Sequence, residues 1–140
     1  MKKLEFKISI NADREKVWDA LWADANYRRW TSIFSETSHA KSDWKEGSEI
    51  LFLDKDENGM YSLIEKLDKP SEMKFKHLGE LKKGEKLKGD WSEAIEQYQL
   101  FDEDGKTDLL ISVDSNEEFA DFFEKTFPNS LQIVKEISES

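Results

Sequence analysis

The stretch from Asn116 to Ser140 constrains the fold of this chain most strongly, because its pattern is that of one long amphipathic helix. Its apolar residues recur every three or four positions and share one face, while charged residues occupy the other face. The apolar set comprises Phe119, Phe122, Phe123, Phe127, Leu131, Val134 and Ile137. Such a face must be covered by another element of the domain. The pattern therefore predicts a C-terminal helix packed against the rest of the chain.

Most of the chain before this helix alternates between apolar and polar residues, which is typical of antiparallel strands with one buried face. The expected strands are 3–10, 35–42, 49–54, 60–67, 72–79, 91–101 and 107–113. Residues 13–23 have helical spacing instead, and a second helix of one or two turns follows Asp24; Asn11, Asp13 and Asp24 are candidate caps. We therefore expect an α+β fold: a seven-stranded curved antiparallel sheet wrapped around the long C-terminal helix, with two short helices between strands one and two.

Pro128 lies inside the expected C-terminal helix. Proline lacks an amide hydrogen and crowds the carbonyl four residues earlier, here that of Glu124. We expect a kink or restart between two segments, about 116–127 and 128–138, that are continuous or nearly so, with Asn129 and Ser130 helping to satisfy freed backbone groups. Since Phe127 lies at the break, we further expect the kink, rather than the straight part, to shape any cavity beneath the helix.

The composition is that of one soluble domain. A chain of 140 residues with 37% hydrophobic side chains is long enough to bury a single core, so we expect one domain over residues 1–140. The net charge of -10 repels phosphate backbones and anionic lipid, which disfavours nucleic acid as a partner. The cluster Lys82, Lys83, Lys86 and Lys88 is interrupted by glycines and a glutamate, and is interpreted as a solvated hairpin tip.

Several kinds of chemistry lack their usual residues. The chain has no cysteine, its two histidines are 38 positions apart, and its glycines fit turns rather than a phosphate-binding loop. We therefore expect no cofactor and no metal site. The N-terminus lacks the apolar core of a signal peptide, and no apolar run approaches the ~20 residues needed to cross a bilayer. These features predict a cytoplasmic protein without membrane insertion.

His77 is the most interesting titratable residue, because it shares a strand face with Met73 and Phe75. An imidazole in that position can act as a general base or orient a ligand carbonyl. The alternative is a histidine that is merely hydrogen-bonded in the core or at its rim, and the sequence favours this simpler interpretation. His39 lies on a polar strand and is interpreted as solvated. Simple alternation favours the solvent face for four further polar residues in strand-like segments: Glu65, Glu93, Glu96 and Gln97. The alternative is that one of them points inward as a buried acceptor, which would make it a candidate for a functional site.

The sequence resembles the START-like helix-grip superfamily, and most closely the heat-shock-protein ATPase activator homologue-like (AHSA) branch of the SRPBCC proteins. The residues that carry the resemblance are Ile10-Asn-Ala-Asp-Arg-Glu-Lys-Val17-Trp18-Asp-Ala-Leu21, then Trp30, Trp44-Lys-Glu-Gly47, Ile64-Glu65 leading to Pro70, and Gly105-Lys-Thr107. The resemblance implies a deep cavity between the C-terminal helix and the sheet, often used for hydrophobic or aromatic small molecules. Its relatives include lipid carriers, polyketide cyclases and domains that stimulate a chaperone ATPase, so the fold does not select one function.

Three functions stay open. The first is a binding domain for a hydrophobic or aromatic small molecule, and the alternative to it is that the aromatic rings fill the space completely. The second is a polyketide cyclase- or hydrolase-like enzyme that uses His77 with Tyr98 or a pocket carboxylate. The third is an interaction with a chaperone through exposed tryptophans among Trp18, Trp22, Trp30 and Trp44. The residues expected to line the pocket are Trp30, Phe34, Phe52, Phe75, His77, Trp91, Tyr98, Phe123, Phe127 and Leu131.

Overall fold

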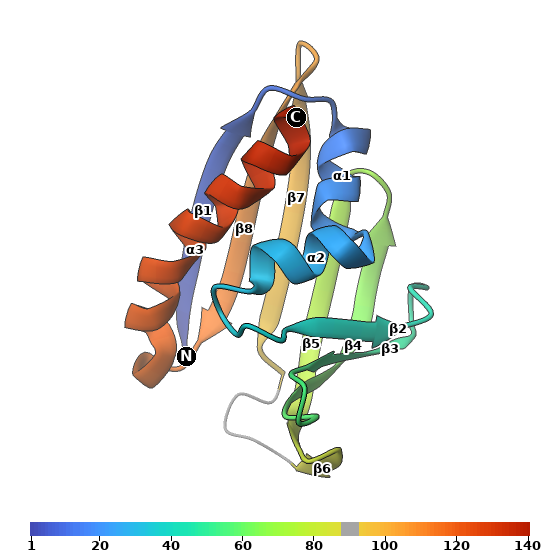
Figure 1. The fold of residues 1–140 in the computed structure, drawn as a ribbon, viewed down its shortest axis with the longest axis vertical. Coiled ribbons are helices and arrows are strands. Elements are labelled where there is room, and N and C mark those ends of the chain that lie inside the picture. The colour runs from blue at the N-terminus through green and yellow to red at the C-terminus, as the bar shows by residue number, and fades with distance from the viewer. Residues whose placement is uncertain (88–92) are drawn as a thin grey trace.

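A computed structural model describes residues 1–87 and 93–140 of the chain (Figure 1). Its elements, in chain order, are β1 (Lys2–Ile10), α1 (Arg14–Trp22), α2 (Asp24–Thr31), β2 (His39–Ser42), β3 (Glu49–Leu53), β4 (Gly59–Asp68), β5 (Glu72–Lys82), β6 (Glu85–Leu87), β7 (Ile95–Glu103), β8 (Lys106–Ser115) and α3 (Glu117–Glu139). The α+β class, the two short helices after the first strand and the long C-terminal helix are confirmed.

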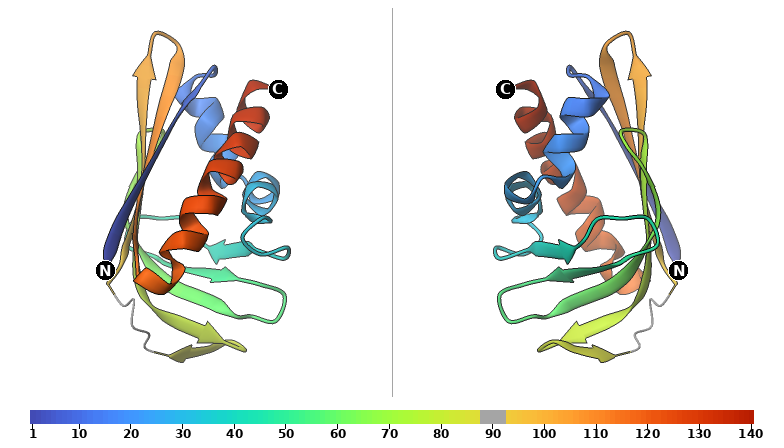
Figure 2. Two further views of the ribbon diagram at one scale, coloured as in Figure 1. Left: turned by 90° about the vertical axis from the view of Figure 1, so that its left-hand side faces the viewer. Right: turned by 90° about the vertical axis from the view of Figure 1, so that its right-hand side faces the viewer.

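The strands form one antiparallel sheet in the order β1-β8-β7-β5-β4-β3-β2, and β6 pairs with β5 beside this path. The short strand β6 was predicted only as part of a turn, because three residues are too few to show a periodicity. Lys82, Lys83 and Lys86 lie at this β5–β6 hairpin, whereas Lys88 lies outside the described residues. Figure 2 shows that the sheet curves and that all three helices lie on its concave side.

The buried face of the sheet follows from period-2 alternation. On β5 the alternate residues Met73, Phe75 and His77 are buried, and on β8 Leu109 and Ile111 are fully buried. These side chains meet apolar residues of α1 and of the second half of α3: Val17, Leu21, Leu131 and Val134. The main core therefore lies between the sheet and the paired helices α1 and α3.

The two short helices begin differently. Asp13 caps α1 as expected, because its Oδ1 accepts a hydrogen bond from the backbone amide of Lys16 at 2.9 Å. The cap expected from Asp24 is wrong: Ala23 is the N-cap of α2, without a side-chain hydrogen bond. Asp24 is instead the first helical residue and pairs with Arg28 one turn later, at 2.9 Å.

Helix α3 is capped by Asn116, whose Oδ1 accepts from the amide of Phe119 at 2.9 Å. The helix continues without interruption through Pro128, so the two expected segments are continuous. Ser130 Oγ donates to the carbonyl of Phe127 at 2.9 Å, next to the position where proline removes a backbone bond.

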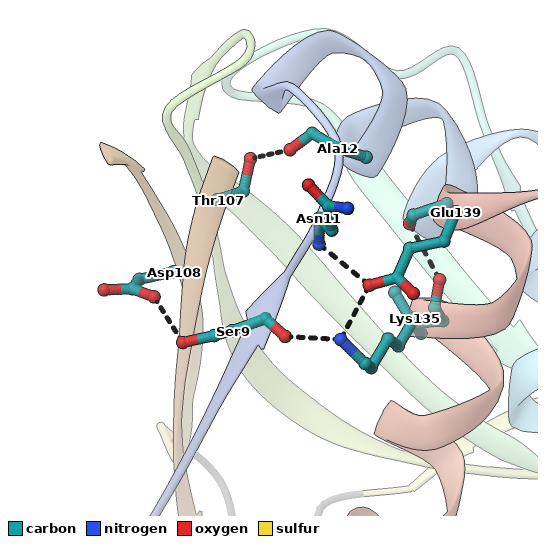
Figure 3. Close-up of polar contacts among 9 residues, drawn as sticks. Ser9, Asn11, Ala12, Thr107, Asp108, Lys135 and Glu139 are labelled. Atoms are coloured by element: carbon teal, nitrogen blue, oxygen red, sulfur yellow. Dashed lines mark hydrogen bonds and ion pairs between the residues drawn. The ribbon is translucent and has the colours of Figure 1, made fainter. Parts of the chain in front are cut away.

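Polar contacts hold the C-terminal end of α3 against the end of β1 (Figure 3). Lys135 Nζ donates to the carbonyl of Ser9 at 2.9 Å, and Glu139 accepts from the amide of Asn11 at 2.8 Å. Lys135 and Glu139 also form an ion pair at 2.6 Å. These contacts and the core beneath Leu131 fix the second half of α3, whereas the first half extends beyond this core.

Candidate ligand-binding cavity

A cavity of about 590 Å³ lies between the first half of α3, helix α2 and the inner face of the sheet. Aromatic rings form much of its wall, contributed by α2, β3 and α3, and the strands β5, β7 and β8 add polar groups. The apolar and aromatic lining residues include Tyr27, Trp30, Phe34, Phe52, Met60, Leu81, Val113, Phe119, Phe122, Phe123 and Phe127. A cavity of this size is within the range of small-molecule sites.

Seven of the residues expected to line a pocket lie on this wall: Trp30, Phe34, Phe52, His77, Tyr98, Phe123 and Phe127. Phe75 does not, because its ring is fully buried against Trp22, Phe52 and Tyr98. Leu131 does not either, because it lies in the core on the C-terminal side of Pro128. Trp91 lies outside the described residues. Ligand contact by any of these residues stays a prediction.

The position of the cavity on α3 can be compared with the expectation that a kink at Pro128 shapes it. Its wall on α3 ends at Phe127, immediately before the proline, and includes Phe119, Phe122 and Phe123 from the preceding turns. The cavity therefore lies beneath the half of the helix that precedes Pro128. Phe127 closes its inner end and stacks on Phe6, with ring centroids 4.8 Å apart.

A hydrogen-bonded polar network lies on the sheet side of the cavity. Ser62 Oγ is 2.6 Å from His77 Nδ1, and His77 Nε2 is 3.1 Å from Glu96 Oε1. Tyr98 donates its phenolic hydrogen to the other oxygen of Glu96. Ser62 is fully buried behind His77, whereas His77, Glu96 and Tyr98 all line the cavity. The histidine is thus hydrogen-bonded, as the simpler interpretation expected, and it also faces the cavity.

Glu96 is the one of the four polar strand residues that points inward, which the sequence analysis held as the less favoured alternative. Simple alternation favoured the solvent face for it as for Glu65, but its side chain is only 19% exposed and points into the cavity. Glu96 has the same parity as Tyr98 and Leu100, which are both buried. The strand phase set by these two residues would have placed it correctly. Glu65 is exposed and pairs with Lys74 at 3.1 Å.

The two tyrosines of the cavity wall are held in their protonated form. Burial raises the pKa of Tyr98 well above its ordinary value, and the negative charge of Glu96 and its hydrogen bond raise it further. The pKa of Tyr27 is raised by burial first and by Glu96 second, against a smaller lowering by a hydrogen bond with Ser38. Both rings therefore present neutral phenols to the cavity at physiological pH.

The mouth of the cavity carries exposed aromatic rings. Phe119 and Phe122 on α3 are 47% and 43% exposed, although they lie on a helix with a buried face. Phe34 packs against Phe122 and Phe123, with ring centroids 6.1 and 6.3 Å away. These rings give the cavity an apolar rim as well as an apolar wall.

Within the described residues 1–87 and 93–140, no group of three or more acidic or histidine side chains is arranged to hold a metal ion. No helix in this part of the chain has the length and apolar character needed to span a membrane. Trp18, Trp22 and Trp30 are buried and Trp44 is half-buried, so these four tryptophans do not form the exposed patch that a chaperone interaction through them requires.

The arrangement of a curved antiparallel sheet, a long C-terminal helix and an intervening cavity defines a helix-grip protein of the SRPBCC type. Residues 11–134 match the family model described as Activator of Hsp90 ATPase homolog 1-like protein, and the chain belongs to this family. A search of curated protein sequences gave no significant match.

Solved structures share the fold at low sequence identity. The Aha1 dimer from Colwellia psychrerythraea is 20% identical, with a TM-score of 0.74 over 99% of this chain and 97% of that chain. The AHSA1-like protein from Aeromonas hydrophila is 17% identical, with a TM-score of 0.72 over 99% and 92%. CalU16 from Micromonospora echinospora is 14% identical, with a TM-score of 0.71 over 97% and 75%. At these identities the likeness shows the fold alone.

Proposed function

We propose that this protein binds a hydrophobic or aromatic small molecule in the cavity between α3 and the sheet. The observation that supports the proposal most is the combination of a cavity of about 590 Å³, a wall of aromatic rings and one polar network on its sheet side. Apolar walls supply affinity through burial, and a few placed polar groups orient a ligand. Close-packed interiors do not leave such a space, so the rings do not fill the fold completely.

The proposal is tested by filling part of the cavity with a larger side chain and measuring whether ligands still bind. Val113 lies on the cavity wall of β8, and Leu110 lies on the same strand with its side chain on the other face. We expect Val113→Trp to abolish the thermal stabilisation given by apolar aromatic compounds, and Leu110→Trp to retain it. A ligand that binds only the folded state raises stability by RT ln(1 + [L]/Kd), so binding is visible as a shift in the melting temperature.

Both variants are first melted without ligand, so that loss of folding is separated from loss of binding. The absence of any shift in the unmodified protein, across uncharged lipids, polyketides, phenols and aromatic amines as well as aromatic acids at high concentration, would count against a binding function. Equal loss in the two variants would show that the ligand does not enter the cavity.

A cyclase- or hydrolase-like activity is the second candidate, and the convergence of His77 and Tyr98 on Glu96 favours it. Such an enzyme needs two groups that can exchange protons with one bound substrate. In this arrangement His77 and Glu96 would be the two groups, and Tyr98, whose raised pKa keeps the phenol protonated, would orient Glu96 through its hydrogen bond. Turnover of a bound polyketide-like compound that is lost in Tyr98→Phe, while binding is kept, would establish the enzyme over the simple binding protein.

A chaperone partner rests on the family description alone. Since the four tryptophans named above do not form an exposed patch, such an interaction would have to use another surface of the described chain. We therefore place the binding function first.

A further inference from the structure

We propose that the cavity selects ligands that donate a hydrogen bond and are neutral or positively charged, such as phenols and arylmethylamines, and that it rejects anions. This inference rests on the proposed function and specifies its ligand class. Glu96 is the residue that sets the selection, because its carboxylate lies on the cavity wall between two donors of the protein.

The hydrogen-bond donors beside Glu96 already donate to its carboxylate. A carboxylate can only accept, so the contact at 3.1 Å requires that His77 Nε2 carries its hydrogen and donates it to Glu96. Tyr98 directs its phenolic hydrogen to the same carboxylate. On the other side of the imidazole, Nδ1 is engaged by the buried Ser62. The donors of this network therefore point toward Glu96 rather than into the free space of the cavity.

Among the described contacts, the Glu96 carboxylate has lone pairs left that can accept further hydrogen bonds. Two carboxylate oxygens offer about four lone-pair positions, of which donors among the described residues, His77 and Tyr98, occupy two. The oxygen of Tyr98 can accept as well. A ligand that reaches this side of the cavity thus meets unused acceptors, and it makes a charge-assisted hydrogen bond only if it brings a donor.

The charged residues on the rest of the cavity wall also disfavour anionic ligands. Glu80 and Asp114 also line the cavity, and Lys82 is the basic residue among the described lining residues. The net charge of the chain, -10, adds to this negative potential. At an effective dielectric constant of about 20, two like charges roughly 6 Å apart repel strongly enough to weaken binding on the order of 100-fold. A fatty acid or an aryl carboxylate is therefore a poor ligand.

Two pairs of matched compounds separate charge from hydrogen bonding. Naphthylmethylamine and naphthoate share one ring system and differ in the sign of their charge, and naphthol and methoxynaphthalene differ in the presence of a donor. We expect calorimetry at neutral pH to show naphthylmethylamine binding at least about 100-fold more tightly than naphthoate, because repulsion alone weakens the anion by that factor and the amine is attracted instead. We expect naphthol to bind roughly tenfold more tightly than methoxynaphthalene, the value of one hydrogen bond to a charged acceptor.

The variant Glu96→Gln removes the charge and keeps the size of the side chain. We expect it to reduce the preference for the amine to below about tenfold, since only the more distant carboxylates remain. Glu65→Gln is the control: it removes the same charge from the exposed side of β4, where Glu65 pairs with Lys74, and should leave both preferences unchanged. Melting of each variant without ligand verifies that it folds.

The outcomes distinguish the ligand class from the binding function. If all four compounds bind with similar affinity, or if naphthoate binds more tightly, the selection by Glu96 is refuted while the binding function stands. If Glu65→Gln changes the preferences as much as Glu96→Gln, the effect comes from the charge of the whole protein and the inference is refuted. If Val113→Trp binds as well as the unmodified protein, the compounds are not in the cavity, and the proposed function fails with the inference.

Discussion

Helix α3 should divide into a half that stabilises the fold and a half that contacts the ligand, and two alanine substitutions test this division. Leu131 lies after Pro128, is 3% exposed and packs in the main core. Phe123 lies before the proline, is half-buried and lines the cavity. The two positions are two helical turns apart on the same apolar face.

The expected costs differ because the surroundings differ. Leu131→Ala leaves a hole in a packed region, and such changes cost about 2–5 kcal/mol. Phe123→Ala removes a ring that already faces empty space on one side; its ring partners Phe122, Phe127 and Phe34 have centroids 5.7, 5.9 and 6.3 Å away. A loss of about 1.5 kcal/mol follows from three such contacts at the low end of the usual range, ~0.5 kcal/mol each. At roughly 3 °C per kcal/mol for a chain of this size, Leu131→Ala should lower the melting temperature by about 10 °C and Phe123→Ala by about 5 °C.

Ligand affinity should be affected in the opposite order, more by Phe123→Ala than by Leu131→Ala. If a bound ligand covers about 50 Å² of the Phe123 ring, its removal costs about 1.3 kcal/mol, or close to tenfold in affinity. Leu131→Ala should bind as the unmodified protein does, once the folded fraction is taken into account. Urea denaturation and calorimetric titration of naphthol measure the two quantities. Equal effects of both substitutions on binding, or a larger stability loss at Phe123, would refute the assignment of the cavity to the first half of α3.

Two other substitutions concern the polar network. Ser62→Ala should destabilise the fold by about 1–3 kcal/mol, because it removes a short hydrogen bond to the buried imidazole of His77. Ser112→Ala, on β8 with only a 3.5 Å contact, is the control, and an equal loss of stability in this variant would contradict the prediction. In Tyr98→Phe the free energy of unfolding should fall less steeply as the pH rises into the alkaline range. The folded-state pKa of Tyr98 is raised above its unfolded value of 10.0, so its stabilisation is fully present below pH 10 and is lost as the pH rises further. Above that pH each such tyrosine costs about 1.4 kcal/mol per pH unit, and urea denaturation at several alkaline pH values should show one such slope fewer in Tyr98→Phe. An unchanged slope would mean that the phenol ionises within the fold.

The secondary structure was largely predictable because long elements carry a clear periodicity. The alternation on β5 and β8 and the apolar stripe of α3 each repeat over several turns or residue pairs. Shorter features were missed: β6 has three residues, and the start of α2 at Ala23 depends on a backbone turn that no side chain marks. A pattern cannot be recognised in a segment shorter than about two of its periods.

The cavity wall was predictable in kind but not in every residue. Aromatic residues on inward-facing positions are recognisable from the sequence, but whether a ring reaches empty space or another ring depends on packing in three dimensions. Phe52 and Phe75 illustrate this: their rings touch, with centroids 5.1 Å apart, yet only Phe52 lines the cavity. Glu96 was recognised only as one of four candidates for an inward-facing acceptor, because charged residues usually face solvent and this preference outweighed the strand phase.

The most direct test of the central claim is a map of amide chemical-shift changes on titration with naphthol. The account predicts that the largest changes at saturation occur around His77, Glu96 and Phe123, which come from β5, β7 and α3 and meet only at the cavity. The outer face around Glu65 should change little. Changes concentrated on the outer face, or no changes at a concentration that raises the melting temperature, would contradict binding in the cavity.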